Sequence, residues 1–507
     1  MYFPFFTNLY KAKAPVLQPT LPTWASIALE RWFTLQECKA RRFFGTTRAR
    51  QEDRMVTSTV DSGVGALYSD YVNPQWVRLL DLLEMNVSYK RCSGSELFTA
   101  DGRRILDFLS GYCVHNVGHN HPGVIAALRE ELELDSPAMI QTHVAERAGE
   151  LGEKLCQRAG GRLTKVFFGS SGSEGVEAAI KFSRAHTGRP GLLYADGAFH
   201  GLTCGALSLM GDSFWRDGFG PLLPETEAIP FDDLDALERK LASKLFGAFI
   251  VEPIQSEGGI RVPAPDYFRA AQSLCRRYGT LLVLDEVQTG MYRTGPFLAG
   301  QRYSADPDMV VLAKAMSGGL VPVSAVLMTE AIYDSVYGSL RRAIIHTSTF
   351  SENGLAMRAA LATLDALETE KLGLRAIEAG EKLRTRLQEA LGGYEMVKGV
   401  RGEGLLLGIE FTAPRSLRLR LPFEAFMHIH PAMFGQIVVM RLFRDAGILT
   451  QICGNNFMVL KVAPPLVVAD DQMDEFVSAI EKVVELAHSS SAFWSEALGL
   501  ARRAIHI

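Results

Sequence analysis

The sequence predicts an α/β fold in which a large domain, built on a doubly wound and mostly parallel sheet, is joined to a small α+β domain. Short apolar runs alternate with helical patterns from about residue 160 to residue 330, as consecutive βαβ units require. Several runs end in polar or glycine residues, which is where open α/β sheets place their ligands. The chain has 507 residues, of which 47% are hydrophobic, enough for a substantial core and two or more domains.

The elements follow one another in a clear order along the chain. Short buried strands are predicted in the large domain in the apolar runs that begin at Lys165, Ala248 and Leu281 and in the run between Pro307 and Lys314, each followed by polar or glycine residues. Helical periodicity covers 354–370 and 380–391, and residues 396–411 read as a strand, a glycine-rich turn and a second strand. These later segments predict the small C-terminal domain.

Two strand ends in the large domain supply groups suited to an aldehyde cofactor. Lys314 follows one strand, and a lysine amine forms a Schiff base more readily where its surroundings favour the neutral form. Asp285 ends another strand, and a carboxylate opposite a pyridine nitrogen keeps the ring protonated so that it can accept electrons. Alone, Lys314 would be interpreted as a solvated surface lysine. The two segments together indicate a pyridoxal-phosphate enzyme.

With Asp285-Glu-Val-Gln288 ahead of Lys314, the chain resembles the class III aminotransferases, which include ornithine, 4-aminobutyrate and putrescine aminotransferases. The resemblance runs from about Leu97 to about Leu486 and keeps the order of the family's motifs. It implies a fold type I transferase in which Lys314 holds pyridoxal 5'-phosphate as a Schiff base. It also implies that Asp285 faces the ring nitrogen and that Gln288 hydrogen-bonds the ring hydroxyl, which favours transamination.

The resemblance also assigns residues to the phosphate and the ring of the cofactor. Ser171, Gly172 and Ser173 open a helical pattern, where backbone amides and small hydroxyl groups suit a phosphate. Phe199, followed by His200, takes the position at which the family stacks an aromatic ring on the pyridine. From the residues alone, the serine turn could equally be a helix cap, and Phe199 and His200 could be core and loop residues.

Thr349 matches a threonine that reaches the cofactor phosphate of the neighbouring subunit in the family. The resemblance therefore implies a homodimer with its active site at the subunit interface. The alternative is an ordinary Ser/Thr turn.

Three further residues are assigned to the substrate side: Tyr112, Glu257 and Lys461. In ornithine aminotransferase-like members the glutamate matching Glu257 pairs with an arginine, whereas this chain has Lys461, which lacks the planar fork that grips a carboxylate. Leu202 stands where many members have a carboxylate-binding arginine. These departures favour an amine, a diamine or an ω-amino acid as donor, and a keto or aldehyde compound as acceptor. On the residues alone, Glu257 is equally a solvated loop acid.

Composition excludes several other classes of function. The net charge of −4 gives no argument for nucleic acid, and no apolar run approaches the roughly 18 residues of a transmembrane helix. His119 and His121 form a His-x-His pair, but such a pair without further ligands is a poor metal site, so we expect a structural turn and no metal. The seven cysteines are scattered and indicate a reduced, cytoplasmic setting.

The N-terminal segment differs in character from the rest. Residues 1–50 contain eight Lys and Arg against two acidic residues, and residues 24–44 begin with amphipathic helical spacing. An inert or packing extension is favoured over a targeting segment or membrane-surface helix.

The expected domain boundaries follow from these patterns. We expect a basic, partly helical extension over 1–80 and a large cofactor-binding domain over 121–370. A small domain made from 81–120 and 371–490 and a tail over 491–507 complete the division.

Two other functions are compatible with parts of the pattern. A decarboxylase or racemase would use the same cofactor residues, and product analysis would distinguish it. A catalytically silent cofactor-binding scaffold is the alternative from a different class. The presence of Lys314, Asp285 and Gln288 together argues against the scaffold.

Overall fold

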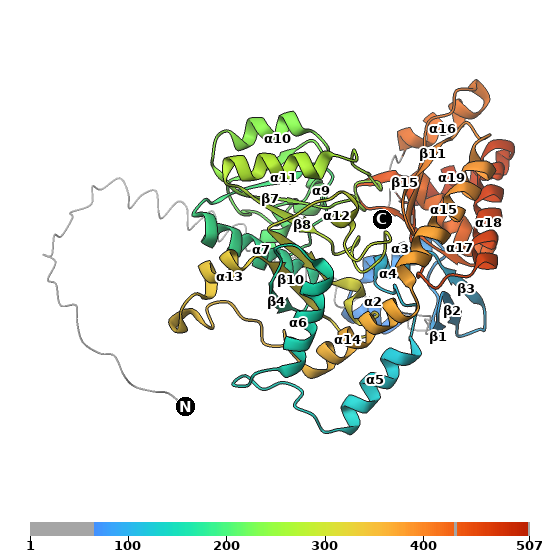
Figure 1. The fold of residues 1–507 in the computed structure, drawn as a ribbon. Coiled ribbons are helices and arrows are strands. Elements are labelled where there is room, and N and C mark those ends of the chain that lie inside the picture. Colours follow the sequence, from blue (N-terminus) through green and yellow to red (C-terminus); the bar gives the residue numbers. More distant parts are fainter. Residues whose placement is uncertain (1–64, 430–432, 505–507) are drawn as a thin grey trace, which may run out of the picture. The chain divides into compact units, whose positions relative to one another are not determined.

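The computed structural model describes residues 65–429 and 433–504 (Figure 1). The chain divides after Ala66, and the unit described below lies within residues 67–507. The basic segment 1–50 and the amphipathic pattern of 24–44 lie outside the described residues, so their roles stay predictions.

A seven-stranded sheet forms the centre of this unit. Its strand order is β4-β10-β9-β8-β7-β5-β6; β10 runs antiparallel to both neighbours, and the other pairs are parallel. The strands are β4 (Lys165–Gly169), β5 (Gly191–Ala195), β6 (Thr226–Ile229), β7 (Phe246–Val251), β8 (Leu281–Asp285), β9 (Met309–Leu312) and β10 (Ser324–Met328). The prediction of a doubly wound, mostly parallel sheet is confirmed.

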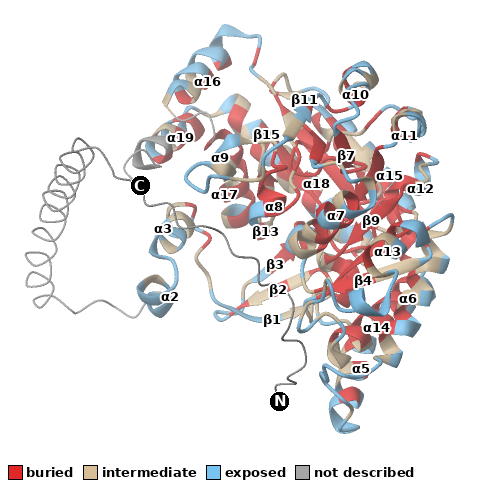
Figure 2. Cartoon of the chain, turned by 90° about the vertical axis from the view of Figure 1, so that its left-hand side faces the viewer, coloured by how far each residue is buried: buried red, intermediate tan, exposed pale blue. Residues whose placement is uncertain are grey.

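Both faces of this sheet are covered. Every residue of β7, β8, β9 and β10 is buried. In a sheet with one solvent-exposed face, buried and exposed residues would alternate along each strand. In β5, Leu192 and Tyr194 belong to one buried cluster, whereas Leu193 and Ala195 belong to the other. Figure 2 shows the buried residues concentrated along these strands. Polar side chains of this sheet can therefore act only at the strand ends.

Helices flank the sheet and begin and end at residues suited to those positions. Ser171 caps α7 because its Oγ accepts a hydrogen bond from the amide of Glu174 at 3.2 Å, and left-handed Gly188 ends the helix. The helices of this part are α5 (Pro122–Glu133), α6 (Glu146–Ala159), α7 (Gly172–Thr187), α8 (Cys204–Leu207), α9 (Ser213–Arg216), α10 (Leu234–Leu241), α11 (Tyr267–Tyr278), α12 (Ala299–Arg302), η1 (Lys314–Ser317), α13 (Glu330–Tyr337), η2 (Leu340–Arg342) and α14 (Gly354–Thr369).

Two smaller sheets are built from the segments on either side. One contains β1 (Tyr89–Ser93), β2 (Glu96–Thr99), β3 (Arg104–Asp107) and β13 (Ile448–Leu449), with β13 parallel to β3. The other, antiparallel, contains β11 (Val397–Glu403), β12 (Leu406–Phe411), β14 (Gln451–Cys453) and β15 (Asn456–Val462). The β3–β13 pairing joins an N-terminal segment to a C-terminal one. This pairing supports the proposal that 81–120 and 371–490 form one small domain.

The remaining helices surround these sheets. They are α2 (Ala66–Tyr71), α3 (Pro74–Leu82), α4 (Ser110–Cys113), α15 (Leu372–Leu391), α16 (Leu417–Ile429), α17 (Phe434–Ala446), α18 (Asp470–Ser489) and α19 (Ser491–Ala504). The segment 491–507, proposed as a tail, thus contains α19, in which Phe493 and Trp494 are buried. None of the helices in the described residues is long and apolar enough to cross a membrane.

Candidate active site

Lys314 stands just beyond the carboxyl end of β9, at the start of η1. Its φ of 39° is left-handed, an uncommon conformation for a residue with a side chain, and Gly318 and Gly319 continue the turn with positive φ. The amine has no hydrogen-bond or ion-pair partner among the described residues. Burial lowers the pKa of this amine, while Asp285 acts in the opposite direction. The lowered pKa favours the neutral, nucleophilic form.

Asp285 ends β8 and is buried beside a histidine. Its Oδ2 lies 2.8 Å from Nδ1 of His200, and its Oδ1 accepts a hydrogen bond from the amide of Val287 at 3.1 Å. Burial lowers the pKa of His200, but Asp285 outweighs this effect and the net shift is upward. Glu252, directly after β7, is electrostatically coupled to both groups, and burial raises its pKa to about 7. The ends of β7 and β8 and the loop after β5 thus supply a buried acid–histidine–acid cluster.

The start of α7 lies against the loop that carries the predicted stacking ring. The Oγ of Ser173 accepts a hydrogen bond from the amide of Leu202 at 3.2 Å. Gly201 has a φ of 122°, and a Cβ there would collide with Ser173. Gly172 lies against the turn that follows β8, since a Cβ on it would lie 3.0 Å from the Val287 side chain. The structure therefore brings this helix start together with the Asp285 turn.

Glu257 and Lys461 form a buried ion pair. Gln288 Nε2 also donates to Glu257 Oε1 at 3.2 Å, and the amide of Gly454 donates to Oε2 at 2.8 Å. The ring of Tyr112 covers the lysine, whose Nζ lies 4.9 Å from the ring centroid. Burial raises the pKa of Glu257, but Lys461 outweighs it and the net shift is downward; the pKa of Lys461 is raised by Glu257 despite burial. Both groups are therefore charged.

The predicted cofactor residues pass a test of fit that this structure provides. Gln288 Oε1 is buried and has no hydrogen-bond partner among the described residues. A buried polar atom without a partner is costly and calls for an explanation. A polar aromatic aldehyde with a ring hydroxyl, bound at Lys314, would supply a partner for this oxygen.

Thr349 is placed differently from the other predicted residues. It is exposed, and its carbonyl oxygen accepts a hydrogen bond from Gln141 Nε2 at 3.3 Å. In the described chain its side chain makes no hydrogen bond to another predicted site residue. The segment around it exposes large apolar side chains, including Leu340 at 98%, Ile344 at 82% and Phe350 at 59%.

The His-x-His pair behaves as a structural feature. His119 Nε2 lies 2.7 Å from Asp107 Oδ2, and His121 Nε2 lies 2.7 Å from Glu370 Oε1. The described part of the chain contains no group of three or more His, Cys, Asp or Glu able to hold a metal ion.

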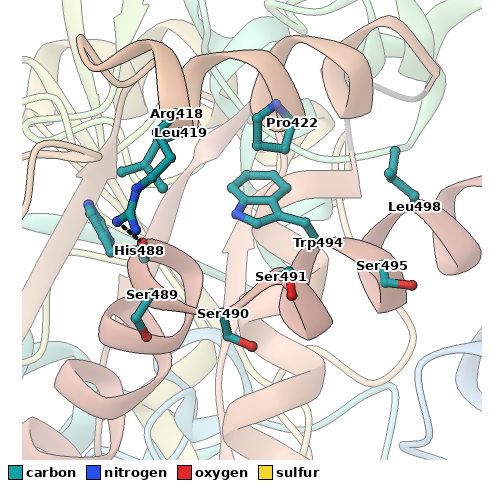
Figure 3. A pocket seen from close by; sticks show the side chains of 10 residues that line it. All are labelled: Arg418, Leu419, Pro422, His488, Ser489, Ser490, Ser491, Trp494, Ser495 and Leu498. Atoms are coloured by element: carbon teal, nitrogen blue, oxygen red, sulfur yellow. Dashed lines mark hydrogen bonds between the residues drawn. The ribbon is translucent and has the colours of Figure 1, made fainter.

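A cavity of about 450 Å³ lies elsewhere, between α16 and the junction of α18 and α19 (Figure 3). Trp494 and Pro422 line it, and Arg418 donates a hydrogen bond to the carbonyl oxygen of His488 at 2.7 Å. It contains none of the predicted site residues, so it is separate from the candidate active site.

Sequence reasoning missed three residues of this site: Glu252, Trp215 and Asn455. Glu252 directly follows the fully buried strand β7, and a glutamate in that place is a signal for a buried carboxylate. Trp215 meets Phe199 edge-on with ring centroids 5.4 Å apart. Asn455 accepts a hydrogen bond from the Trp215 indole at 2.8 Å across 240 residues of chain, for which the sequence offers no local signal.

The fold and these residues define a pyridoxal-phosphate enzyme of the aminotransferase type. The model of the aminotransferase class-III family matches residues 81–484, and the chain belongs to this family, whose members use pyridoxal phosphate. Both the recognition of this family from the sequence and the expected cofactor are confirmed.

Two relatives illustrate the likeness in sequence. Aminotransferase PigE of a Serratia species is 36% identical over 449 residues, which is 82% of this chain and 53% of that protein. The chain thus spans about half the length of PigE. Putrescine aminotransferase of Pectobacterium atrosepticum is 38% identical over 368 residues, covering 70% of this chain and 78% of that protein.

Solved structures agree in fold. The ornithine aminotransferase of Toxoplasma gondii is 31% identical with a TM-score of 0.70, covering 80% of this chain and 91% of that one. An amine transaminase from an uncultivated Pseudomonas species, with pyridoxal phosphate bound, is 29% identical with a TM-score of 0.70, covering 79% of this chain and 95% of that one. The expected fold type I architecture is confirmed.

Proposed function

We propose that this protein transfers an amino group from an amine, diamine or ω-amino acid donor to a keto or aldehyde acceptor. The observation that supports this most strongly is the unpartnered Lys314 amine, with a lowered pKa, among three strand ends of a class III aminotransferase fold. The names of the relatives, a putrescine aminotransferase and an amine transaminase, are in keeping with donors that lack an α-carboxylate.

Each residue of the large-domain site has a distinct part in this proposal. When bound, pyridoxal phosphate supplies an electron sink that stabilises a carbanion on the donor. Lys314 would hold the cofactor and, when not bound to it, would act as the base and acid that carries a proton at the reacting carbon of the donor. Asp285, held by the His200 contact, would keep the ring nitrogen protonated. Gln288 would contact the ring hydroxyl with its Oε1, which has no partner among the described residues.

The phosphate and the ring face are assigned to the helix start and the neighbouring loop. Ser171, Gly172 and Ser173 offer backbone amides and hydroxyl groups at the N-terminus of α7, where an anion is favoured. Phe199 stacks on the ring. The close contact between Ser173 and the loop after Phe199 supports placing both groups on one ligand.

The substrate side is assigned to Tyr112, Glu257 and Lys461. Because Lys461 is already paired with Glu257, it offers no free cation to an α-carboxylate. Leu202, which is exposed, offers none either. A donor without an α-carboxylate therefore loses no binding interaction at this site.

We further propose a cytoplasmic homodimer in which Thr349 reaches the partner's cofactor phosphate. Two observations support it. The apolar side chains exposed around Thr349 suit a subunit interface, and the cysteines of the described chain are all free, as in a reducing compartment. Light scattering would test whether the protein is a homodimer. A Thr349→Ala variant should bind the cofactor more weakly, which would test the role of Thr349.

The first experiment is the visible spectrum of the purified holoenzyme, recorded while ornithine, putrescine, glutamate and alanine are added separately without an acceptor. We expect putrescine, the donor of this panel that has no carboxylate, to convert the absorbance of the lysine-bound cofactor into that of its amine form. Release of CO₂ or racemised donor, with no amine form of the cofactor, would overturn the proposal in favour of a decarboxylase or racemase.

A further inference from the structure

Trp215 gives the candidate site an aromatic wall that neither the motifs nor the family comparison assigns. It lies on α9 and is partly buried, and its ring stands edge-on to Phe199 at 5.4 Å between centroids. Its neighbour Phe214 is 72% exposed and meets it edge-on in turn, at 5.2 Å. The wall is thus continuous with the ring proposed to stack on the cofactor.

The position of Trp215 is fixed by polar contacts. Its indole N–H donates to Asn455 Oδ1 at 2.8 Å. The Nδ2 of Asn455 donates to the carbonyl oxygens of Gly197 at 3.1 Å and Ala198 at 3.0 Å, and its amide donates to the carbonyl oxygen of Glu257 at 2.9 Å. The indole is therefore held between the turn that precedes β15 and the loop that precedes Phe199. A ring held in this way presents a defined apolar face at little entropic cost.

The same turn brings Trp215 next to the buried ion pair. A Cβ added at Gly454 would lie 3.5 Å from Cζ2 of Trp215 and 3.2 Å from Oε2 of Glu257. On the other side of the pair, the Tyr112 ring covers Lys461. Two aromatic rings thus flank the position at which Glu257 and Lys461 are paired.

The charges of the ion pair between these rings are matched to each other. Glu257 accepts hydrogen bonds from Lys461 and Gln288 on one oxygen and from the Gly454 amide on the other. Lys461 donates to Glu257, its Nζ lies over the Tyr112 ring, and its side chain is completely buried. A second charge on a substrate, carboxylate or ammonium, would have to break this arrangement or lie unpaired, which is costly in a buried site.

We propose that Trp215, Gly454 and Tyr112 form an apolar substrate subsite, so that the preferred substrate is a monoamine, or the matching aldehyde or ketone, with an alkyl or aryl group. This inference rests on the proposed aminotransferase function and narrows its donor class. A long alkyl chain or an aryl ring would lie against the Trp215 face, while the buried ion pair, whose two charges already match each other, disfavours the second charge of a diamine or an amino acid.

The test is a series of amines added to the holoenzyme: n-propylamine, n-hexylamine, 2-phenylethylamine and putrescine. Loss of the lysine-bound cofactor's absorbance gives kcat/KM of the donor half-reaction for each. We expect n-hexylamine to exceed n-propylamine by up to roughly fourfold per added methylene, the transfer value of a buried CH₂, and to exceed putrescine. 1-Hexanol, which has no amine to donate, should compete with n-hexylamine more strongly than 1-propanol does.

Trp215→Ala should lower the ratio of kcat/KM for n-hexylamine over n-propylamine by about tenfold, mainly through KM, and should remove the advantage of 1-hexanol over 1-propanol. Trp215→Phe should restore most of the ratio. Phe219→Ala, at a phenylalanine that is 67% exposed and makes no ring contact with Trp215, is the matched control and should change the ratio less than twofold.

Three outcomes would overturn the subsite. They are an unchanged ratio in Trp215→Ala, an equal loss for all donors in both Trp215 variants, and a native preference for putrescine over n-hexylamine. A cofactor band that no amine of the series alters would instead overturn the proposed function and the subsite with it.

Discussion

The two halves of the candidate site differ in how their polar groups are paired. At the carboxyl edge of the large sheet, the partly buried Lys314 and the buried Gln288 Oε1 have no hydrogen-bond partner within the described chain. On the small-domain side, Lys461 and Glu257 are buried and paired with each other, and Glu257 accepts further hydrogen bonds from Gln288 and the Gly454 amide. The difference indicates that the first half is prepared for a polar cofactor and the second is already neutralised. Chemistry and selectivity can therefore be altered separately.

The largest expected effect comes from Lys314→Ala. Removing both the anchor and the proton carrier should lower turnover by roughly 10⁴-fold or more. Borohydride reduction of the native holoenzyme, followed by peptide mass spectrometry, should find the cofactor on Lys314. The exposed Lys482→Ala serves as control and should keep full turnover. Cofactor found on another lysine would refute the assignment.

Asp285→Asn should have the next largest effect, about 10²- to 10³-fold on kcat, because the ring nitrogen loses its carboxylate. The pKa of His200 should fall as well, since Asp285 is what raises it above its ordinary value. Steady-state kinetics and the NMR titration of His200 measure the two effects. Asp235→Asn, on the exposed face of α10, is the matched control; a His200 titration that does not move would contradict the described cluster.

Breaking the buried ion pair should affect stability more than chemistry. Lys461→Met leaves Glu257 charged and buried, and should lower the free energy of unfolding by roughly 3–5 kcal/mol. The double variant Lys461→Met/Glu257→Gln should regain much of this loss because no unpaired charge remains. Chemical denaturation of both variants provides the measurement.

An exposed ion pair provides a reference for the loss of unfolding free energy expected of Lys461→Met. Lys382 and Asp470 lie 3.2 Å apart with about half of each side chain exposed, so their removal should cost less than about 1 kcal/mol. A Lys461→Met loss no larger than this would show that the buried pair is not the stabilised unit described here.

The smallest expected effect is on the pH dependence of stability. Burial raises the pKa of Glu252 to about 7, from 4.5. A carboxyl with a raised folded pKa contributes stability that is fully present below the unfolded pKa and is lost as pH rises through the folded value. The native protein should therefore lose about 1–3 kcal/mol of unfolding free energy between pH 4.5 and 7 that Glu252→Gln does not lose. Denaturation at several pH values compares the two slopes, and parallel slopes would contradict the shift.

The comparison also explains what could be predicted from the sequence. The sheet, Lys314 and Asp285 follow from local signals, because a buried strand and the polar residue at its end are neighbours in the chain. The expected juxtaposition of Glu257 and Lys461 came from the family's positions and not from spacing. Trp215 and Asn455 could not be foreseen, since a hydrogen bond across 240 residues leaves no pattern in either segment.

Other expectations stay open for physical reasons. Thr349 was assigned to a partner subunit, and a single chain shows only that it is exposed. Glu257 accepts hydrogen bonds from Gln288 and the Gly454 amide in addition to Lys461, and these two donors come from further segments. Local spacing cannot reveal how many donors converge on one carboxylate.

The pairing of β3 with β13 has a consequence for folding during synthesis on the ribosome. Leu106 lies opposite Ile448, so the N-terminal sheet cannot be completed until about 340 further residues have been made. At the usual ribosomal rates this interval lasts roughly 20 to 70 seconds, long enough for the intervening large domain to collapse first. During that time Leu97, Ile105 and Leu106, all buried in the finished fold, have no sheet partner from the C-terminal segment. Nascent chains should therefore depend on chaperones through this segment more than through the central sheet.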